Sequence, residues 1–269
     1  MHEFQERPPI ATSPVSVLLP VFNQAANLVA IVEAWVQQFN ILQKEYELLL
    51  IDDASTDQSA ILGQALTSRH PHVRFFHHET RRGFGGCLRT GLEAAGHPLL
   101  CYTPCDYQYQ PADLKRFLKW IDRVDLVAGY RTIRSRAYRL SWKEYISRWV
   151  IRRMFGMHLR DLGCLFVLAR RSIFARLPIQ SPGLFSHVEI LAKANFMSCF
   201  MTEVPVALPP PTKETPNPWA LDKGQYWRQA RHVFFHAHFG LPVIDSDGFT
   251  PSTPLETNIE PGTKSIIDT

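Results

Sequence analysis

The chain has 269 residues, of which 45% are hydrophobic and 20% are charged, and it carries a formal net charge of +4 at pH 7. This composition is ordinary for a soluble globular protein with one large core, and so mild a charge excludes whole-chain electrostatics as an argument for nucleic-acid binding. The five cysteines are odd in number and form no CxxC pair, which favours free thiols in a reducing compartment.

Residues 1–13 are predicted to be a polar lead-in without the apolar core of a signal peptide. No later run approaches the roughly 18 to 20 apolar residues that a membrane-spanning helix needs. We therefore expect a cytoplasmic protein, and any contact with a membrane must be peripheral.

Short apolar runs alternate with helical patterns over the first half of the chain. The runs are rich in β-branched residues and leucine, and they predict strands at 16–22, 46–51, 73–77, 99–102 and 124–129. Pro20 is expected to break the first of them. Apolar spacing predicts helices at 27–39 and 113–121, and a third helix that starts near Thr56 or Asp57. This alternation is typical of a doubly wound, mostly parallel α/β sheet.

The rest of the chain is organised around the stretch 99–111. Its apolar half reads as a buried strand, which Pro104 should end because proline cannot donate to a sheet ladder. Asp106 and Gln108 then fall on the loop at the carboxyl end of the strand, where ligands bind in open α/β sheets. A carboxylate and an amide two residues apart can ligate a hard cation or bind a sugar. A solvated turn, with Asp106 capping the next helix, is the alternative.

The glycine-rich run 83–91 opens a helix that is predicted to end at Ala95. Backbone N–H groups at such a helix start can face an anion. Tight turns use the same residue, and the dinucleotide-binding spacing GxGxxG is absent.

The segment 130–160 has nine basic residues and one acid, Glu144, with aromatic residues between them. A basic aromatic helix can lie on an anionic membrane surface, where each basic group contributes about 1 kcal/mol. It can equally collect phosphates in a cleft, or be an ordinary surface helix whose arginine stems cover apolar area. No nucleic-acid-binding module fits the pattern, so we expect no nucleic-acid partner.

The last third of the chain has weaker signals. Residues 161–169 are expected to form a loop that runs into a strand. A helix at 185–194 and a strand at 203–206 are expected to follow. Aromatic residues at helical spacing predict an amphipathic helix at 222–239. Beyond Pro242 the composition predicts disorder.

The order of these pieces over residues 14–240 resembles the family-2 glycosyltransferases of GT-A type, and within them the polyprenyl-phosphate (dolichol-phosphate) hexosyltransferases. The matching motifs are Leu19-Pro20-Val21-Phe22-Asn23-Gln24, the acidic run 51–57, the glycine run 83–86, Asp106-Tyr107-Gln108, Gly129-Tyr130-Arg131, the Asp161 loop and the strand 203–206. The resemblance implies a GT-A domain at 14–208, a loop and C-terminal amphipathic helix at 209–240 and a disordered tail at 241–269.

The resemblance also implies site residues. Those that would line the pocket for the nucleotide base and ribose are Pro20, Phe22, Gln24 and Asp53. Asp106 and Gln108 would approach Mg²⁺ or Mn²⁺ and the diphosphate. Those that would hold the diphosphate and an incoming lipid phosphate are Arg131, Lys143 and Ser147. The basic aromatic helix would then face the membrane.

Several positions depart from the family pattern. Pro104 replaces the first acid of the metal motif, Gln24 replaces a usual Glu, and Leu165 replaces a favoured Gly. One carboxylate can suffice for Mg²⁺, which completes its shell with water and substrate phosphates. Lys213 stands where relatives carry Arg, and it would act as a point charge without the bidentate fork of arginine.

The implied reaction is inverting transfer of a hexose from a GDP- or UDP-sugar to polyprenyl phosphate at the inner face of a membrane. Asp106 and Arg131 would stabilise the charge of the leaving diphosphate. For a sugar hydroxyl acceptor, Asp161 would be the base, although it could instead cap a turn or pair with Arg160. The alternatives are an inactive relative that binds a nucleotide sugar or a partner protein, and a transferase acting on a soluble or glycan acceptor.

Overall fold

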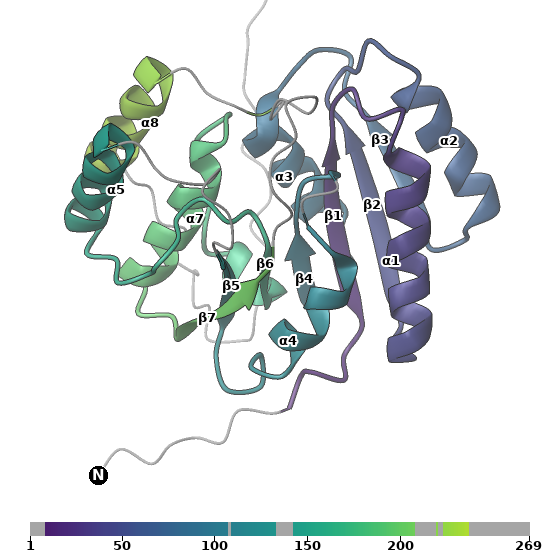
Figure 1. Cartoon of the computed structure of the whole chain (residues 1–269), viewed down its shortest axis with the longest axis horizontal. Helices are drawn as coiled ribbons and strands as arrows, with labels where there is room; N and C mark the ends of the chain where they lie inside the picture. Colours follow the sequence, from purple (N-terminus) through teal and green to yellow (C-terminus); the bar gives the residue numbers. More distant parts are fainter. Residues whose placement is uncertain (1–8, 107–108, 133–141, 208–218, 220–222, 237–269) are drawn as a thin grey trace, which may run out of the picture.

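The computed structural model describes residues 9–106, 109–132, 142–207, 219 and 223–236, without the side chains of 142–145, 147–148 and 223. Within this part of the chain, one seven-stranded sheet has the order β3-β2-β1-β4-β6-β5-β7 (Figure 1). The strands are β1 Val15–Val21, β2 Tyr46–Asp52, β3 Val73–His77, β4 Leu99–Tyr102, β5 Leu126–Arg131, β6 Val167–Arg170 and β7 Met201–Val206.

The sheet is mostly parallel, as predicted. Strands β3, β2, β1 and β4 pair in parallel, and so do β5 and β7, whereas β6 runs antiparallel to both β4 and β5. Every residue of β1 and β2 is buried, as expected where helices cover both faces of a parallel sheet. The carboxyl ends of β1, β2, β3 and β4 therefore share one edge, which we call the carboxyl rim.

Helices flank the sheet, with α1 in front of it and α3 behind it in the view of Figure 1. The helices are α1 Leu28–Leu42, α2 Ser59–Arg69, α3 Gly83–Ala94, α4 Leu114–Leu118, α5 Trp142–Phe155, α6 Arg171–Phe174, α7 Phe185–Phe196 and α8 Lys223–His236. A 3₁₀ turn, η1 Pro111–Asp113, precedes α4. The helix expected at 113–121 is therefore shorter than predicted, because α4 begins after this turn and ends at Leu118.

The expectation that Pro20 breaks the first strand is wrong. Pro20 lies inside β1, paired in register with Ile51 of β2. Its carbonyl faces the β4 side and accepts the Cys105 N–H, at a level where β4 has already ended at Tyr102. The backbone N–H that proline lacks would point to the same side, beyond the last residue of β4, so no hydrogen bond of the sheet is lost. The strand therefore tolerates the proline.

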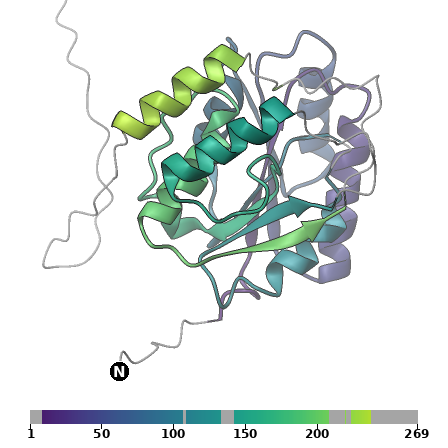
Figure 2. The same ribbon diagram turned by 60° about the vertical axis from the view of Figure 1, so that its left-hand side comes forward.

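Helices α5 and α8 lie side by side on one flank of the molecule, over α7 (Figure 2). Phe155 of α5 contacts Phe234 of α8 with ring centroids 5.7 Å apart, and Phe185 of α7 contacts Tyr226 of α8 at 5.1 Å. None of the described helices has the length and apolarity needed to cross a membrane. The predicted disordered tail, 241–269, lies outside the described residues.

Candidate active site

Asp106 lies at the carboxyl rim, on the loop that leaves β4, as predicted. Beyond β4 this loop keeps bonding to β1, because the Thr103 N–H donates to the Leu18 carbonyl (3.2 Å) and the Cys105 N–H to the Pro20 carbonyl (3.0 Å). Cys105 is buried, while Asp106 is half-buried. The loop therefore holds the carboxylate at the edge where parallel sheets bind ligands.

Asp53 follows β2 and is completely buried. Its carboxylate accepts the Arg82 N–H at 2.7 Å and the Gly83 N–H at 2.9 Å, and the Nδ1 atom of His78 lies 3.1 Å from it. The glycine-rich start of α3 does face an anion, as the sequence suggested, but that anion is the side chain of Asp53. Asp53 thus fixes the backbone at the start of α3, beside the carboxyl rim.

The glycines of this run allow a close approach to the segment that precedes α7. Gly83 has φ +74°, and a Cβ there would lie 2.5 Å from the Pro182 carbonyl oxygen. The Gly85 N–H donates to the same carbonyl at 2.8 Å. A positive φ and a blocked Cβ position both require glycine at residue 83, so packing explains the run without a bound phosphate.

Phe22 follows β1 and is half-buried. The Arg81 guanidinium lies 3.8 Å from the centroid of its ring, and the ring of the buried Trp219 lies 6.3 Å away. Arg81 also lies 3.7 Å from the Asp53 carboxylate. An aromatic ring and a cation beside a buried carboxylate form a surface that suits a nucleotide base and its phosphates.

Gln24 is placed at the start of α1. Its backbone N–H donates to the Ser59 hydroxyl at 2.8 Å, and its side-chain oxygen accepts from the Asn27 amide at 3.3 Å. Its contacts among the described residues therefore tie α1 to α2.

Arg131 and Asp161 form an ion pair between the end of β5 and the loop that precedes β6. The Arg131 Nε lies 2.6 Å from Oδ2 of Asp161, and Nη2 lies 2.7 Å from Oδ1. Burial lowers the pKa of the Arg131 guanidinium, but the hydrogen bonds and charge of Asp161 outweigh it and hold that pKa above its ordinary value. The structure pairs Asp161 with Arg131, a partner that was not considered from the sequence.

The Asp161 carboxylate also accepts the backbone N–H groups of Arg131 (3.1 Å) and Gly163 (2.9 Å). Glu203 of β7 in turn accepts the backbone N–H groups of Arg160 and Asp161. A carboxylate that already accepts four N–H groups has few lone pairs left to face the hydroxyl of a substrate. The geometry therefore favours a positioning role for Asp161.

Tyr109 joins the Asp106 loop to the Asp161 loop. Its buried hydroxyl accepts the Leu165 N–H at 2.9 Å, and its ring meets Phe166 edge-on. Burial raises the pKa of this phenol well above its ordinary value, so it stays protonated. No sequence pattern indicated this contact, which joins residues 56 positions apart.

His187 of α7 lies beneath the same region. Its Nδ1 lies 2.9 Å from the Tyr102 hydroxyl, and within the described part of the chain its buried Nε2 has no hydrogen-bond partner. Burial lowers the pKa of His187 to about 4, with Asp161 opposing this shift and Arg131 adding to it. His187 is therefore neutral at pH 7, a feature that no sequence pattern indicated.

Four predicted site residues are not placed by their side chains. Gln108 and Lys213 lie outside the described residues. Lys143 and Ser147 belong to α5, but their side chains lie outside the described part. Their roles stay predictions.

Comparison with known proteins agrees with the fold. The model of the family described as "Glycosyl transferase family 2" matches residues 16–180. Among solved structures, the chain is similar to glucosyl-3-phosphoglycerate synthase from Mycobacterium tuberculosis. The complex with UDP is 20% identical with a TM-score of 0.60, over 84% of this chain and 80% of that one.

Two further complexes of that synthase are also similar. The complex with Mn²⁺, UDP and glucosyl-3-phosphoglycerate is 19% identical with a TM-score of 0.59, over 84% of this chain and 78% of that one. The complex with Mg²⁺ and UDP is 20% identical with a TM-score of 0.57, over 77% and 74%. These likenesses show that the chain has the fold that the sequence predicted.

Proposed function

This chain belongs to glycosyl transferase family 2, and from that premise we propose that it transfers a hexose, with inversion, from a nucleotide-diphosphate sugar to polyprenyl phosphate. We propose that it does so in the cytoplasm, at the inner face of a membrane.

The observation that carries the choice of acceptor is an exposed apolar surface on α5 and α8. This surface consists of Ile146 and the aromatic residues Trp149, Trp227, Phe234 and Phe235, each 37–68% exposed. Exposed arginines lie on the same two helices, namely Arg153, Arg228 and Arg231. Exposed aromatic residues beside arginines suit the boundary between anionic headgroups and acyl chains. A lipid-linked acceptor would be reached from such a surface.

The donor is assigned to the carboxyl rim. Asp106 offers the hard oxygen ligand that Mg²⁺ or Mn²⁺ prefers, and a magnesium site needs only one or two carboxylates beside substrate phosphates. The similar synthase has been solved with Mn²⁺ or Mg²⁺ together with UDP. When bound, the ion would supply charge stabilisation for the leaving diphosphate. Gln108, two residues on, is proposed as its second ligand.

Arg131 is proposed to bind the same diphosphate. A guanidinium has five N–H donors, and Asp161 engages two of them, one on Nε and one on Nη2. The ion pair fixes the direction of the guanidinium, so its remaining donors are already oriented when the substrate arrives. Phe22 and Asp53 are proposed to border the base and ribose, and Lys143, Ser147 and Lys213 to meet phosphates.

A phosphate acceptor fits the Asp161 geometry better than a sugar hydroxyl does. A phosphate is already anionic and needs no strong base, and the Asp161 carboxylate is occupied by four N–H groups. A soluble phosphorylated acceptor is the second candidate, because the similar synthase was solved with phosphoglyceric acid. Both candidates carry an anionic phosphate, but only polyprenyl phosphate must use it as the nucleophile, because phosphoglyceric acid also carries a hydroxyl.

In the test, purified full-length protein is incubated with Mg²⁺ or Mn²⁺ and with a UDP- or GDP-hexose. The acceptor is either polyprenyl phosphate in anionic vesicles or phosphoglyceric acid. We expect release of nucleoside diphosphate and a glycolipid product only with the lipid acceptor. Product with phosphoglyceric acid alone would establish the second candidate. Nucleotide binding without turnover on any acceptor would overturn both.

Vesicle cosedimentation tests the surface itself. The double variant Trp149→Ser with Phe235→Ser should lose most binding to anionic vesicles. Trp120→Ser is the matched control, because Trp120 is 42% exposed on a different part of the molecule. Equal binding by all three proteins would contradict the membrane assignment.

A further inference from the structure

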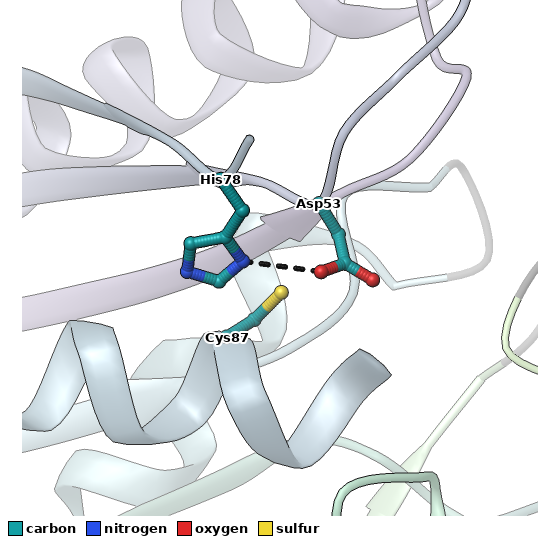
Figure 3. Close-up of side chains that lie close together, drawn as sticks. All are labelled: Asp53, His78 and Cys87. Carbon is teal, nitrogen blue, oxygen red and sulfur yellow. Dashed lines mark hydrogen bonds and ion pairs between the residues drawn. The ribbon is translucent and has the colours of Figure 1, made fainter. Parts of the chain in front are cut away.

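Three side chains from different elements converge behind the start of α3 (Figure 3). Asp53 follows β2, His78 follows β3, and Cys87 projects from α3 toward the other two. A carboxylate oxygen, an imidazole nitrogen and the thiol sulfur all lie within 4.8 Å of one another, and all three residues are buried. A tetrahedral zinc ion with bonds of about 2.0–2.3 Å holds its ligand atoms about 3.3–3.8 Å apart, so a small adjustment of these side chains brings all three atoms to one ion.

Neighbouring groups already orient two of these ligands. The Arg82 and Gly83 N–H groups fix the Asp53 carboxylate at 2.7 and 2.9 Å. On the far side of the imidazole, His78 Nε2 lies 2.9 Å from the Thr90 hydroxyl. With the proton on Nε2 donated to Thr90, the lone pair of Nδ1 points into the cluster. Outer hydrogen bonds of this kind orient the ligands of metal sites.

We propose that Asp53, His78 and Cys87 form a binding site for a thiophilic divalent cation such as Zn²⁺. One oxygen, one nitrogen and one sulfur ligand suit zinc, whereas Mg²⁺ and Mn²⁺ prefer oxygen alone. On binding, the S–H bond of Cys87 breaks and its proton passes to solvent, while sulfur, nitrogen and oxygen each donate an electron pair to the ion. The divalent charge is then balanced by one thiolate and one carboxylate, so the buried site is neutral overall.

This site is separate from the proposed catalytic ion at Asp106, but it borders the proposed donor pocket. Arg81, whose side chain is 50% exposed, lies 3.7 Å from the Asp53 carboxylate and covers Phe22. An ion that enters from this side displaces Arg81 and is coordinated by Asp53. The consequence, which rests on the proposed function, is that Zn²⁺ weakens nucleotide binding.

Cobalt(II) is the probe, because thiolate coordination to Co²⁺ produces a charge-transfer absorption that oxygen ligands do not. The reduced full-length protein should show this band with one equivalent of Co²⁺, and Zn²⁺ should remove it. Cys87→Ala should abolish the band. Cys199→Ala should keep it, because Cys199 lies elsewhere, in the pocket beside β7. His78→Gln, whose amide can donate a hydrogen bond to Asp53, should weaken Co²⁺ binding while the protein stays folded.

No band in the native protein, or a band that persists in Cys87→Ala, overturns the site. Zn²⁺ should also weaken UDP or GDP binding by about tenfold in the native protein and not in Cys87→Ala. A Co²⁺ band in a protein that binds no nucleotide would keep the metal site and refute the proposed donor pocket. Nucleotide binding without the band would keep the proposed donor pocket and refute the metal site.

Discussion

The guanidinium of Arg131 holds the carboxylate of Asp161 through two contacts, 2.6 Å from Nε to Oδ2 and 2.7 Å from Nη2 to Oδ1. The side chains are 21% and 10% exposed, so both charges are largely withdrawn from water. Each charge therefore depends on the other for its stabilisation in the folded protein. The pair links the end of β5 to the loop before β6, and this makes it a structural part of the proposed diphosphate site.

Asp161→Asn should lower the free energy of unfolding by about 3 kcal/mol, because it leaves a largely buried guanidinium without its counter-charge. Urea unfolding measures this change. Arg116→Gln is the control, since the Arg116 side chain is 51% exposed in its pair with Asp113 and should contribute less than about 1 kcal/mol. Equal midpoints for Asp161→Asn and the native protein would show that the pair contributes nothing to stability.

Asp106→Asn should reduce transfer by about 10²- to 10³-fold, the scale of losing one electrostatic stabiliser of a transition state. The unfolding midpoint should hardly move, because Asp106 is a half-buried loop residue. Product formation over a range of Mg²⁺ and Mn²⁺ concentrations is the readout. Glu93→Gln, at an exposed position on α3, should match the native rate. Full activity in Asp106→Asn would remove this residue from the metal site.

Asp53→Ala should raise the KM for the nucleotide sugar, as expected from its place beside the donor pocket. The structure adds a second effect, because the variant leaves the Arg82 and Gly83 N–H groups without their acceptor. The free energy of unfolding should fall by about 2 kcal/mol. Steady-state kinetics and urea unfolding separate the two effects. A variant with native KM but reduced stability would confine Asp53 to a structural role.

The periodic pattern of apolar residues in the sequence was enough to predict most of the fold. Strands 73–77 and 99–102 have the predicted bounds, and the alternation of strands and helices correctly implied a mostly parallel sheet. These features depend on local patterns of apolar residues. The position of Asp106 at the rim followed from the same logic, although β4 ends at Tyr102, before Pro104, and Cys105 still bonds to β1.

The contacts within the site could not be predicted, because they join residues far apart in the chain. Arg131 and Asp161 are 30 positions apart, and the adjacent Arg160 was the more obvious partner by sequence. Tyr102 and His187 are 85 positions apart, and neither belongs to a recognisable motif. The glycine run was compatible with a bound anion or with a tight turn, and nothing local reveals that the Asp53 carboxylate accepts the N–H groups at its start. Tertiary packing, which a single sequence does not display, decides all three.

His187 gives the protein a predictable response to acid. Its pKa is lowered to about 4 in the folded state by burial, whereas an unfolded histidine has a pKa of about 6.5. As pH falls from about 6.5 to about 4, the unfolded state binds a proton that the folded state refuses, so the free energy of unfolding should drop by about 3 kcal/mol. Above pH 6.5, and below pH 4, this residue adds no further slope.

Urea unfolding between pH 4 and 8 measures how the free energy of unfolding depends on pH. Comparison of the native protein with His187→Gln isolates the contribution of His187. Glutamine can still meet the Tyr102 hydroxyl but does not titrate, so the variant should lose that part of the slope whatever its stability at pH 7. His158→Gln is the matched control, because His158 is exposed when folded and so changes its surroundings little on unfolding. A His187→Gln profile parallel to the native one would mean that His187 takes up its proton in the folded state. The neutral Tyr102–His187 contact would then be wrong.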